Sequence, residues 1–354
     1  MAYTTIDDPT AHFQTKLYTG TGSSLAITGV GFQPDWIWFK SRSQAQSHAI
    51  VDSVRGREGL QSNTNEAEYT LNSAKDFGTF DSDGFTVLTP EQLNSFNYNT
   101  GSIVAWNWKA GTAFSNDASS TSVGSIDSAG SVNTTAGFSI ITYTGTGSAG
   151  TIAHGLGAVP GWYVIKRRNS SEHWQVYHEN NTSAPGTDYL QLSTAEATVD
   201  AATRWNDTVP TSTVFSVGAH ASVNADASTY VAYCFAEKKG YSKFGSYTGS
   251  GNADGPFAYT GFKPAFVLIK QTTDGSTPWF IFDTKRNPGN SADLKLNPDD
   301  AAAESAANEI EILSNGFKVS TSGSYNNGSG KNMIYMAFAE SPFVTSTGIP
   351  ATAR

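Results

Sequence analysis

The chain has little of what would indicate a disulfide-stapled or a nucleic-acid-binding protein. Its 354 residues include one cysteine, Cys234, and 22 Lys and Arg stand against 31 Asp and Glu, for a net charge of −9. One cysteine cannot form a disulfide within the chain, and Cys234 lies in an apolar run where a buried, inert thiol is expected. Because contacts of Lys and Arg with phosphates dominate affinity for nucleic acids, we expect no nucleic-acid partner.

Long apolar runs are also missing from the sequence. No stretch approaches the roughly 20 apolar residues that a membrane-spanning helix needs. The first five residues have neither the basic region nor the apolar region of a signal peptide. We therefore expect a protein that folds in a reducing cytosol and does not insert into a membrane.

Patterns typical of catalytic and metal-binding sites are scarce. No Gly-x-Ser-x-Gly or Cys/His arrangement occurs. The segment Asp81–Gly84 has the acidic spacing of a calcium loop but lacks its closing glutamate, so a hairpin turn is favoured. We expect no metal, no cofactor and no enzymatic activity. The six histidines, which show no metal-ligand spacing, are His12, His48, His154, His173, His178 and His220.

What the sequence does contain is one pattern written three times. The motif Tyr-Thr-Gly-(Thr/Ser)-Gly occurs at Tyr18–Gly22, Tyr143–Gly147 and Tyr247–Gly251. Each copy leads into another strand instead of a helix, which favours a turn over a phosphate cradle. A repeat of about a hundred residues has the size of a small domain, too long for a solenoid unit. Further positions that we align between the copies are Lys40, Lys166 and Lys270; Leu60, Leu190 and Leu294; and Ala105, Ala232 and Ala337.

The pattern within each copy predicts an all-β fold. Short runs of aromatic and β-branched residues alternate with polar ones and are separated by Gly, Asn, Ser and Asp clusters, as in half-buried antiparallel strands. We expect three tandem β-sandwich modules, jelly-roll-like, with at most a short helix in each. The helical candidates are Asp299 to Ile312, with aspartates at its start, and a shorter turn within Thr194 to Thr203. The expected boundaries are an N-terminal tail 1–9, modules at 10–110, 137–240 and 241–345, a polar connector 111–136, and a C-terminal tail 346–354.

An acid and an arginine recur three residues apart at a strand end. Two copies have the pairs Asp52 with Arg55 and Asp283 with Arg286, while the second copy has His178 there. A glycosidase would need a second carboxylate about 5–10 Å away, and none recurs beside these. We expect exposed or half-buried ion pairs that hold a loop, each worth about 0–2 kcal/mol.

Tryptophan is abundant and is placed on strand faces. Alternation puts Trp36 and Trp38 on one face of a strand, and Trp106 with Trp108 on one face of another. In a sandwich one strand face is core, so the other must be covered by a module, a subunit or a stacked sugar ring. The candidate interface or glycan-contact residues are Trp36, Trp38, Trp106, Trp108 and Trp162. Large exposed apolar patches are unusual in monomers, so we expect a homo-oligomer, by analogy a trimer.

Four further stretches carry a resemblance to a protein family. They are Ala2–Pro9, the pattern Phe32-x-Pro34-Asp35-Trp36, the run Asp52–Gly56, and Gly240–Tyr247. The chain resembles, over essentially its whole length, a repeat-containing family of structural and fibre proteins from marine bacteriophages. Members are taken to be tail fibres, tail-associated adhesins or head-surface proteins. The first module begins close to Met1, which is unlike a shaft-bearing fibre, so we expect a compact surface protein attached separately.

The resemblance implies a non-enzymatic virion protein, either a fibre or knob on the tail or a head decoration, assembled in the host cytoplasm. Its expected partners are other virion proteins. One alternative is an adhesin that binds host-surface carbohydrate through exposed aromatics. A weaker alternative is a glycan-degrading tailspike, which would need a carboxylate pair in a groove.

Overall fold

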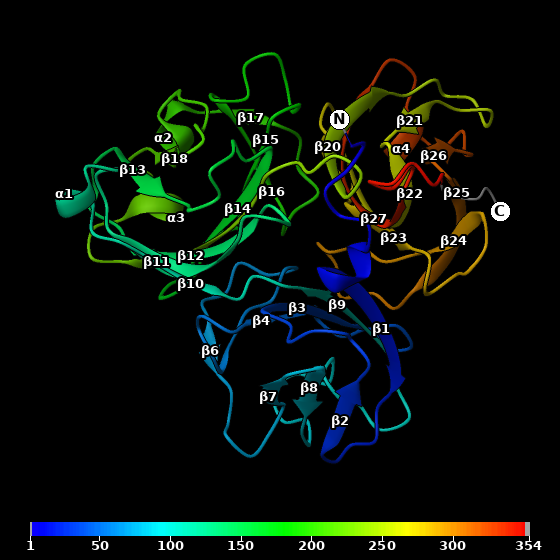
Figure 1. Ribbon diagram of the computed structural model, residues 1–354, viewed down its shortest axis with the longest axis horizontal. Helices are drawn as coiled ribbons and strands as arrows, with labels where there is room; N and C mark the ends of the chain where they lie inside the picture. Colours follow the sequence, from blue (N-terminus) through cyan, green and yellow to red (C-terminus); the bar gives the residue numbers. More distant parts are fainter. Residues whose placement is uncertain (1, 351–354) are drawn as a thin grey trace.

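The computed structural model describes residues 2–350 and has three lobes, one for each copy of the repeat (Figure 1). The all-β fold is confirmed, because strands dominate and every α-helix in the described part is a single four-residue turn. None of the helices in residues 2–350 has the length and apolar character needed to cross a membrane.

The strand bounds of the three modules are as follows. The first contains η1 (Pro9–Ala11), β1 (Phe13–Thr19), β2 (Leu25–Thr28), β3 (Trp36–Ser41), β4 (Ala49–Asp52), β5 (Glu58–Gly59), β6 (Tyr69–Thr70), β7 (Phe77–Asp81), β8 (Gly84–Val87) and β9 (Ser102–Trp108). The second contains β10 (Thr112–Asn116), α1 (Ala118–Thr121), β11 (Ser128–Asn133), β12 (Phe138–Thr144), β13 (Gly150–Ala153), β14 (Trp162–Arg167), β15 (Gln175–His178), β16 (Asp188–Gln191), β17 (Val199–Asp200), α2 (Ala202–Trp205), β18 (Val214–Val217), α3 (Ala221–Asn224) and β19 (Thr229–Phe235). The third contains β20 (Ser242–Thr248), β21 (Phe257–Tyr259), β22 (Phe262–Gln271), β23 (Phe280–Asp283), β24 (Ser291–Lys295), β25 (Ser305–Leu313), β26 (Gly316–Val319), α4 (Ser324–Asn327) and β27 (Asn332–Pro342).

The three modules share one topology. Each has an antiparallel sheet in which the first strand pairs with the last, and the last pairs with the third: β1-β9-β3-β4, β12-β19-β14-β15 and β20-β27-β22-β23. A second layer in each module pairs the second strand with a later one, as in β2-β8-β7, β13-β18 and β21-β26-β25-β24. Two stacked antiparallel layers around a core form a β-sandwich.

The repeated Tyr-Thr-Gly-x-Gly motif is a turn locked to the segment before the last strand. In the first module the Tyr18 hydroxyl donates to the Phe96 carbonyl at 2.5 Å, and the amide of Thr21 donates to Oδ1 of Asn97 at 2.8 Å. A side chain at Gly20 would lie 2.1 Å from the Tyr98 carbonyl oxygen, so only glycine fits. The same pairs of bonds recur with Tyr143 to Val223 and Thr146 to Asn224, and with Tyr247 to Asn326 and Ser250 to Asn327.

The main sheet of each module is buried on both of its faces. All six residues of β3 are buried, and so are all but the first residue of β9. Odd and even side chains along these strands enter two different apolar clusters. One cluster lies between the two layers of each sandwich, and the other is a single core that all three modules share. The main sheets therefore face one another around the centre of the molecule (Figure 1).

The segment 111–136, expected as a polar connector, forms strands of the second module. β10 and β11 pair with each other, and β11 pairs with β12, which extends the main sheet of this module to eight strands. The Ser, Gly and Ala content that is typical of a linker here permits close strand contact. A side chain at Gly130 would lie 1.8 Å from the Ile140 carbonyl oxygen. Within the expected N-terminal tail 1–9, the described residues likewise pack on the third module, where the Tyr3 hydroxyl donates to the Gly261 carbonyl at 2.7 Å.

The helix predicted over Asp299 to Ile312 is wrong. Residues 301–304 are irregular and β25 covers Ser305–Leu313, because Ile310 and Ile312 alternate with glutamates and pair with β26. In the second candidate segment, Thr194 to Thr203, the chain forms β17 and then begins α2 at Ala202. The second module also has two helical turns, α2 and α3, in addition to α1, where at most one was expected.

Strand register corrects two of the positions that we aligned between copies. Leu60 and Leu190 oppose Ile50 and Val176, and the residue opposite Ile281 is Leu296, not Leu294. The alanine alignment shifts as well. The residue before each recurring lysine pairs with the last strand of its module, opposite Ala105, Ala232 and Tyr335 respectively. Ala337 is therefore not equivalent to Ala105 and Ala232.

Candidate functional site: the interface of the three modules

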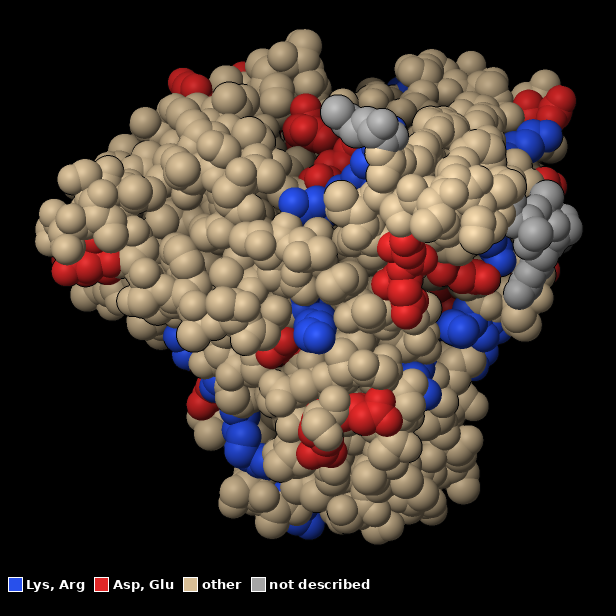
Figure 2. Space-filling model, viewed as in Figure 1, with Lys and Arg blue, Asp and Glu red and all other residues tan. Residues whose placement is uncertain are grey.

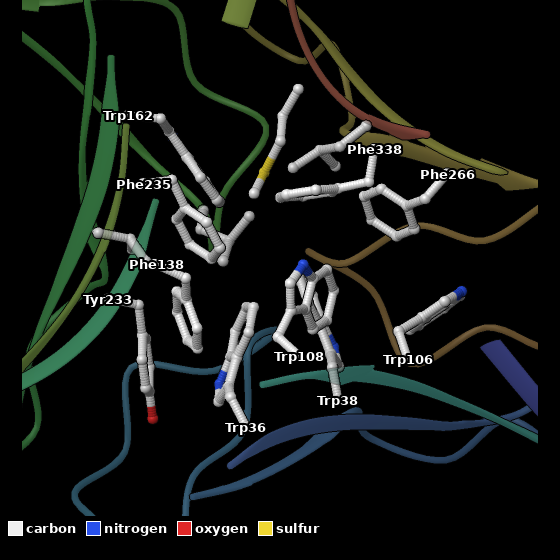
Figure 3. Packing of buried hydrophobic residues seen from close by; sticks show 14 of the residues in the cluster. Trp36, Trp38, Trp106, Trp108, Phe138, Trp162, Tyr233, Phe235, Phe266 and Phe338 are labelled. Atoms are coloured by element: carbon white, nitrogen blue, oxygen red, sulfur yellow. The ribbon is translucent and has the colours of Figure 1, made fainter. Parts of the chain in front are cut away.

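The five tryptophans singled out in the sequence form the centre of the molecule. Trp36 and Trp38 come from β3, Trp106 and Trp108 from β9, and Trp162 from β14 (Figure 3). Each is between 0 % and 1 % exposed. They are interface residues, and their burial rules out the alternative that they contact glycan.

Aromatic contacts connect every pair of modules. Trp36 stacks on Tyr233 of the second module with ring centroids 4.7 Å apart. Trp108 meets Phe338 of the third module at 5.5 Å, and Phe338 meets Phe235 of the second at 5.7 Å (Figure 3). Stacked and edge-to-face pairs at these separations add about 0.5–1.5 kcal/mol each beyond the burial of their area.

The three recurring lysines, Lys40, Lys166 and Lys270, form a cyclic set of bonds between modules. Each lysine is fully buried near the end of the third strand of its sheet, and its ammonium donates to backbone carbonyls of its own loop and of the neighbouring module. Burial lowers the pKa of each of these lysines to about 8. The bonds between modules are Lys40 Nζ to Ala301 O at 2.9 Å, Lys166 Nζ to Asn65 O at 3.0 Å, and Lys270 Nζ to Ala195 O at 3.2 Å.

A second cyclic set of bonds joins a ring nitrogen of one module to a backbone carbonyl of the next. The carbonyl belongs to the residue after the recurring leucine, which is Leu60, Leu190 or Leu296. In the second and third modules the ring is a tryptophan, and in the first it is His48. Because Trp38 Nε1 donates to Nδ1 of His48, the histidine proton lies on Nε2 and faces the carbonyl of Asn297. Burial and the nearby Lys40 hold the pKa of His48 well below its usual value. The three bonds are His48 to Asn297 at 2.9 Å, Trp174 to Gln61 at 2.8 Å, and Trp279 to Gln191 at 3.0 Å.

Backbone bonds complete the cyclic arrangement. In each module, the residue eight positions after the recurring leucine donates its backbone N–H across the interface. The acceptor is the backbone carbonyl of the residue two positions after the recurring lysine of the neighbouring module. The bonds are Glu68 to Arg168 at 2.8 Å, Thr198 to Thr272 at 2.9 Å, and Glu304 to Arg42 at 2.9 Å. Three modules joined head to tail in this way have the contacts of a heterologous cyclic trimer within one chain.

The acid–arginine pairs lie inside this interface. Asp52 and Asp283 are 0 % and 1 % exposed, which is far more buried than the sequence led us to expect. Arg55 Nε contacts Asp52 at 2.6 Å, and the Tyr233 hydroxyl of the second module donates to the same carboxylate at 2.7 Å. The matching bonds of the third module are Arg286 Nε to Asp283 at 2.5 Å and Trp106 Nε1 to Asp283 at 3.0 Å.

These carboxylates have no capacity left for catalysis. Oδ1 of Asp52 accepts from the amides of Val54 and Arg55, and Oδ2 accepts from Arg55 and Tyr233. A general acid needs a reachable proton and a route for substrate, and a fully bonded, solvent-free carboxylate has neither. Across residues 2–350, no group of three or more His, Cys, Asp or Glu side chains is arranged to hold a metal ion. Cys234 is buried as a free thiol, and burial raises its pKa.

Two of the three module interfaces carry buried ion networks. Glu68 bridges Arg55 and Arg168 at 3.2 and 2.8 Å. Glu304 bridges Arg286 and Arg42 at 2.9 and 2.8 Å. The interface between the second and third modules has no such network among the described residues, because the equivalent positions are Asn181, Thr198 and Thr272.

Open hollows lie on the surface around this centre. One of about 660 Å³ follows the polar strands β10, β11 and β12 of the second module. A second of about 490 Å³ lies between the second and third modules, and a third of about 400 Å³ runs along β1 beside Lys285. On the face drawn in Figure 2, charged residues occur in small groups separated by uncharged surface.

The sequence named the tryptophans, lysines and acid–arginine pairs but not their common role. His48 was set aside as an isolated histidine, although it precedes β4 as Trp174 and Trp279 precede β15 and β23. Asn97, Asn224 and Asn327 were also missed. A signal for them existed, since an asparagine recurs shortly before the last strand of each copy.

Comparison with known proteins places nearly the whole chain in one family. A family model described as "Domain of unknown function (DUF7483)" matches residues 8–342, which include all three modules. No curated protein matches the chain.

Proposed function

We propose, for a chain that belongs to the family described as "Domain of unknown function (DUF7483)", a non-enzymatic structural role on the surface of a bacteriophage particle. The family description states no activity, so the proposal rests on how the chain uses its repeated residues and on the resemblance described above.

The observation that carries the proposal is that the polar residues that recur between the modules bind other parts of the same chain. The three lysines, the two aspartate–arginine pairs and the Tyr-Thr-Gly-x-Gly turns are bonded to the protein's own backbone or to a neighbouring module. An enzyme built from repeats would keep at least one polar constellation open to substrate. A structural protein instead uses such groups to fix the geometry of its lobes.

The arrangement also bears on partners. The apolar face that led us to expect a homotrimer is covered by the other two modules of the same chain. The packing reason for self-association is thereby removed, and the three lobes supply the shape that a trimer would have had. Contacts with other virion proteins then fall to the exposed outer surfaces of the lobes, as a tail fibre or knob or as a head decoration.

A carbohydrate-binding adhesin is supported by a different surface. Phe257 and Tyr259 of β21 are 45 % and 53 % exposed, and the hydroxyl of Tyr3 lies 3.2 Å from that of Tyr259. Exposed aromatic faces stack on sugar rings or on apolar protein surfaces. The weaker alternative, a glycan-degrading tailspike, loses the repeated carboxylates of Asp52 and Asp283 to the buried ion pairs.

The test is to locate the protein on assembled particles. Antibodies against the purified chain, applied to phage particles from the strain that encodes it and imaged by immunogold microscopy, should label one defined place on the intact virion. The purified chain should release no sugars from host polysaccharide. The proposal would be contradicted if mass spectrometry finds no copy of the protein in purified particles. It would also be contradicted if the purified chain hydrolyses host polysaccharide and Asp52→Asn or Asp283→Asn abolishes that activity.

A further inference from the structure

The groove between the second and third modules differs from its two counterparts in the same molecule. At the other interfaces a glutamate lies between two arginines, in Arg55–Glu68–Arg168 and in Arg286–Glu304–Arg42. Here the three positions hold shorter, uncharged side chains, and the backbone bond from Thr198 to Thr272 is kept. The interface therefore retains its geometry while the space of two guanidinium groups and a carboxylate is left open, as a groove of about 490 Å³.

The lining of this groove is chemically uniform. Every residue that lines it is Asn, Ser or Thr, contributed by both modules. An ionic ligand would need a charged side chain, and an apolar ligand would need aliphatic or aromatic side chains, and none of the lining residues is of either kind. Amides and hydroxyls provide donors and acceptors together, which is the complement of a neutral polyhydroxyl molecule.

One side chain of the lining is left with an unmet bond. Asn181 is 1 % exposed, and its amide nitrogen has no hydrogen-bond partner within residues 2–350. Its amide oxygen accepts from the Thr198 hydroxyl at 2.6 Å. If the amide is turned by 180°, its nitrogen donates to Thr198 and its oxygen becomes the unpaired atom, so one polar group stays unsatisfied in either orientation. A buried polar group without a partner costs free energy, and because this nitrogen has almost no accessible surface, a bound ligand recovers that cost only when the side chain rotates toward the groove.

The remaining contacts hold the walls of the groove in place. Asn332 donates to the Asn181 carbonyl and to the Thr272 hydroxyl, both at 3.2 Å. Asn180 donates to the Phe244 carbonyl at 2.9 Å, which fixes the second module against β20. Ser183 and Ser246 are exposed at the rim. The site is thus preformed at its base and open to solvent at its edge.

We propose that this groove binds a neutral saccharide, with the amide of Asn181 and the hydroxyls of Thr198 and Thr272 as hydrogen-bonding partners. The volume falls within the range of about 300–1,000 Å³ typical of small-molecule sites. The groove has no aromatic wall for stacking, so binding relies on hydrogen bonds and its affinity is modest. This inference extends the adhesin alternative and does not depend on where the protein lies on a particle.

The experiment uses the full chain, labelled with nitrogen-15, and a panel of neutral monosaccharides that contains glucose, galactose, mannose and N-acetylglucosamine. At least one sugar should cause saturable shifts of the Asn181 side-chain amide resonances. Because the ligand is uncharged, the apparent affinity should be the same at low and high salt.

The decisive variant fills the groove with the residues of the other two interfaces: Asn181→Arg, Thr198→Glu and Thr272→Arg. The same triad of side chains occurs at the other two interfaces, there with an aspartate beside the first arginine where this module has His178, so the melting temperature of the variant checks that it folds. It should lose saccharide binding by at least ~10-fold, the change that about 1.4 kcal/mol represents. The matched control is Thr142→Ala in the polar hollow along β12, which should bind as the wild type does.

Two results overturn the proposal. One is that no sugar of the panel shifts the Asn181 amide at concentrations up to about 100 mM, far above the millimolar range of weak sites. The other is that the filled variant folds and binds sugar like the wild type, which would move the site elsewhere, for example to the aromatic surface at Tyr259. Neither result affects the immunogold localisation, so the failure of this inference and the failure of the virion assignment are distinguishable.

Discussion

At the scale of single residues, the most informative groups are charged side chains placed where charge is costly. Lys166 ends a fully buried stretch of β14, and its ammonium donates to Asn65 and Glu172 carbonyls at 3.0 and 2.6 Å. Carbonyls accept hydrogen bonds but carry no full charge to offset the ammonium. The same holds at Lys40 and Lys270. Burying each of the three ammonium groups costs desolvation free energy, and each forms a directional hydrogen bond to a neighbouring module.

The lysines predict how stability changes with pH. Burial lowers the pKa of Lys166 to about 8, whereas the unfolded chain keeps a value near 10.5. Between these values the unfolded state binds more protons than the folded state, so the contribution of this lysine to the free energy of unfolding increases as pH rises from about 8 to about 10. Urea unfolding measured at several pH values should show that Lys166→Met removes part of this increase relative to the wild type.

Comparison with the wild type cancels two opposing contributions. Burial raises the pKa of Cys234 and of Tyr233, so both groups lower stability as the pH increases through their unfolded-state values. The control is Lys318→Met, which removes a surface lysine whose pKa is raised by its hydrogen bond to Asp254, so this variant should not reduce the increase of stability with pH. An identical slope in Lys166→Met and the wild type would mean that this lysine is not buried as a cation.

The buried aspartates predict a large effect from a small substitution. In Asp283→Asn an amide group replaces a carboxylate that accepts from Arg286 and Trp106, which removes the closer of the two carboxylates paired with the buried Arg286 guanidinium and leaves Glu304. Breaking a buried pair costs about 3–5 kcal/mol, more than the 0–2 kcal/mol expected from sequence alone. Chemical denaturation measures the change. The matched surface pair, in Asp254→Asn, should lose far less stability because both of its groups are solvated, and equal effects at the two sites would contradict the buried network.

At the scale of elements, a compensated exchange of ring size distinguishes the first module from the others. Where the second and third modules have Val164 with Trp174 and Leu268 with Trp279, the first has Trp38 with His48. The large ring moves from the residue before the fourth strand to the third strand. The bond to the neighbouring module survives, because imidazole and indole both offer a ring N–H.

This exchange predicts strong coupling between the two positions. His48→Trp alone overpacks the core and should cost about 1–3 kcal/mol. Adding Trp38→Val restores the pattern of the second module and should recover most of that loss, so a double-mutant cycle from thermal or urea unfolding should give a clearly favourable interaction energy. Additive effects would show that the two side chains do not share one space.

The features that could be predicted from the sequence are those that are determined by residues close together in the chain. Alternating aromatic and β-branched residues identified the strands, and glycines with asparagines identified the turns. The helix over Asp299 to Ile312 was misassigned because alanine content outweighed the alternation of Ile310 and Ile312 with glutamates. The connector was misassigned because Gly130 marks a close strand contact that is visible only once β12 is beside it.

The cyclic bonds could not have been predicted in the same way. Their acceptors are backbone carbonyls, such as those of Asn65, Ala195 and Ala301, and a carbonyl has no signature in the residue type. The recurrence of the lysines was visible, but its meaning depends on a neighbour that lies about a hundred residues away in the chain. The tryptophans were correctly seen as needing cover, and the cover turned out to be the rest of the same chain.

At the scale of the whole molecule, the shared core implies that the modules do not fold separately. An isolated third module, residues 241–345, would expose Phe244, Phe266, Leu268, Met336 and Phe338, all between 0 % and 3 % exposed in the full chain. An apolar surface of this kind favours aggregation or self-association. We expect the isolated module to be insoluble or oligomeric, and the full chain to be monomeric by light scattering at its mass of 37.6 kDa.

The central claim, that three repeats form one cooperative structure around a common aromatic core, is tested most directly by differential scanning calorimetry of the full chain. The account predicts one transition whose van't Hoff enthalpy equals its calorimetric enthalpy, about 250 kcal/mol for a chain of this length near 60 °C at ~0.7 kcal/mol per residue. Trp108→Ala should lower the temperature of this transition without splitting it, because the ring of Trp108 contacts the third module as well as its own. Three separate transitions, or a van't Hoff enthalpy near one third of the calorimetric value, would contradict it.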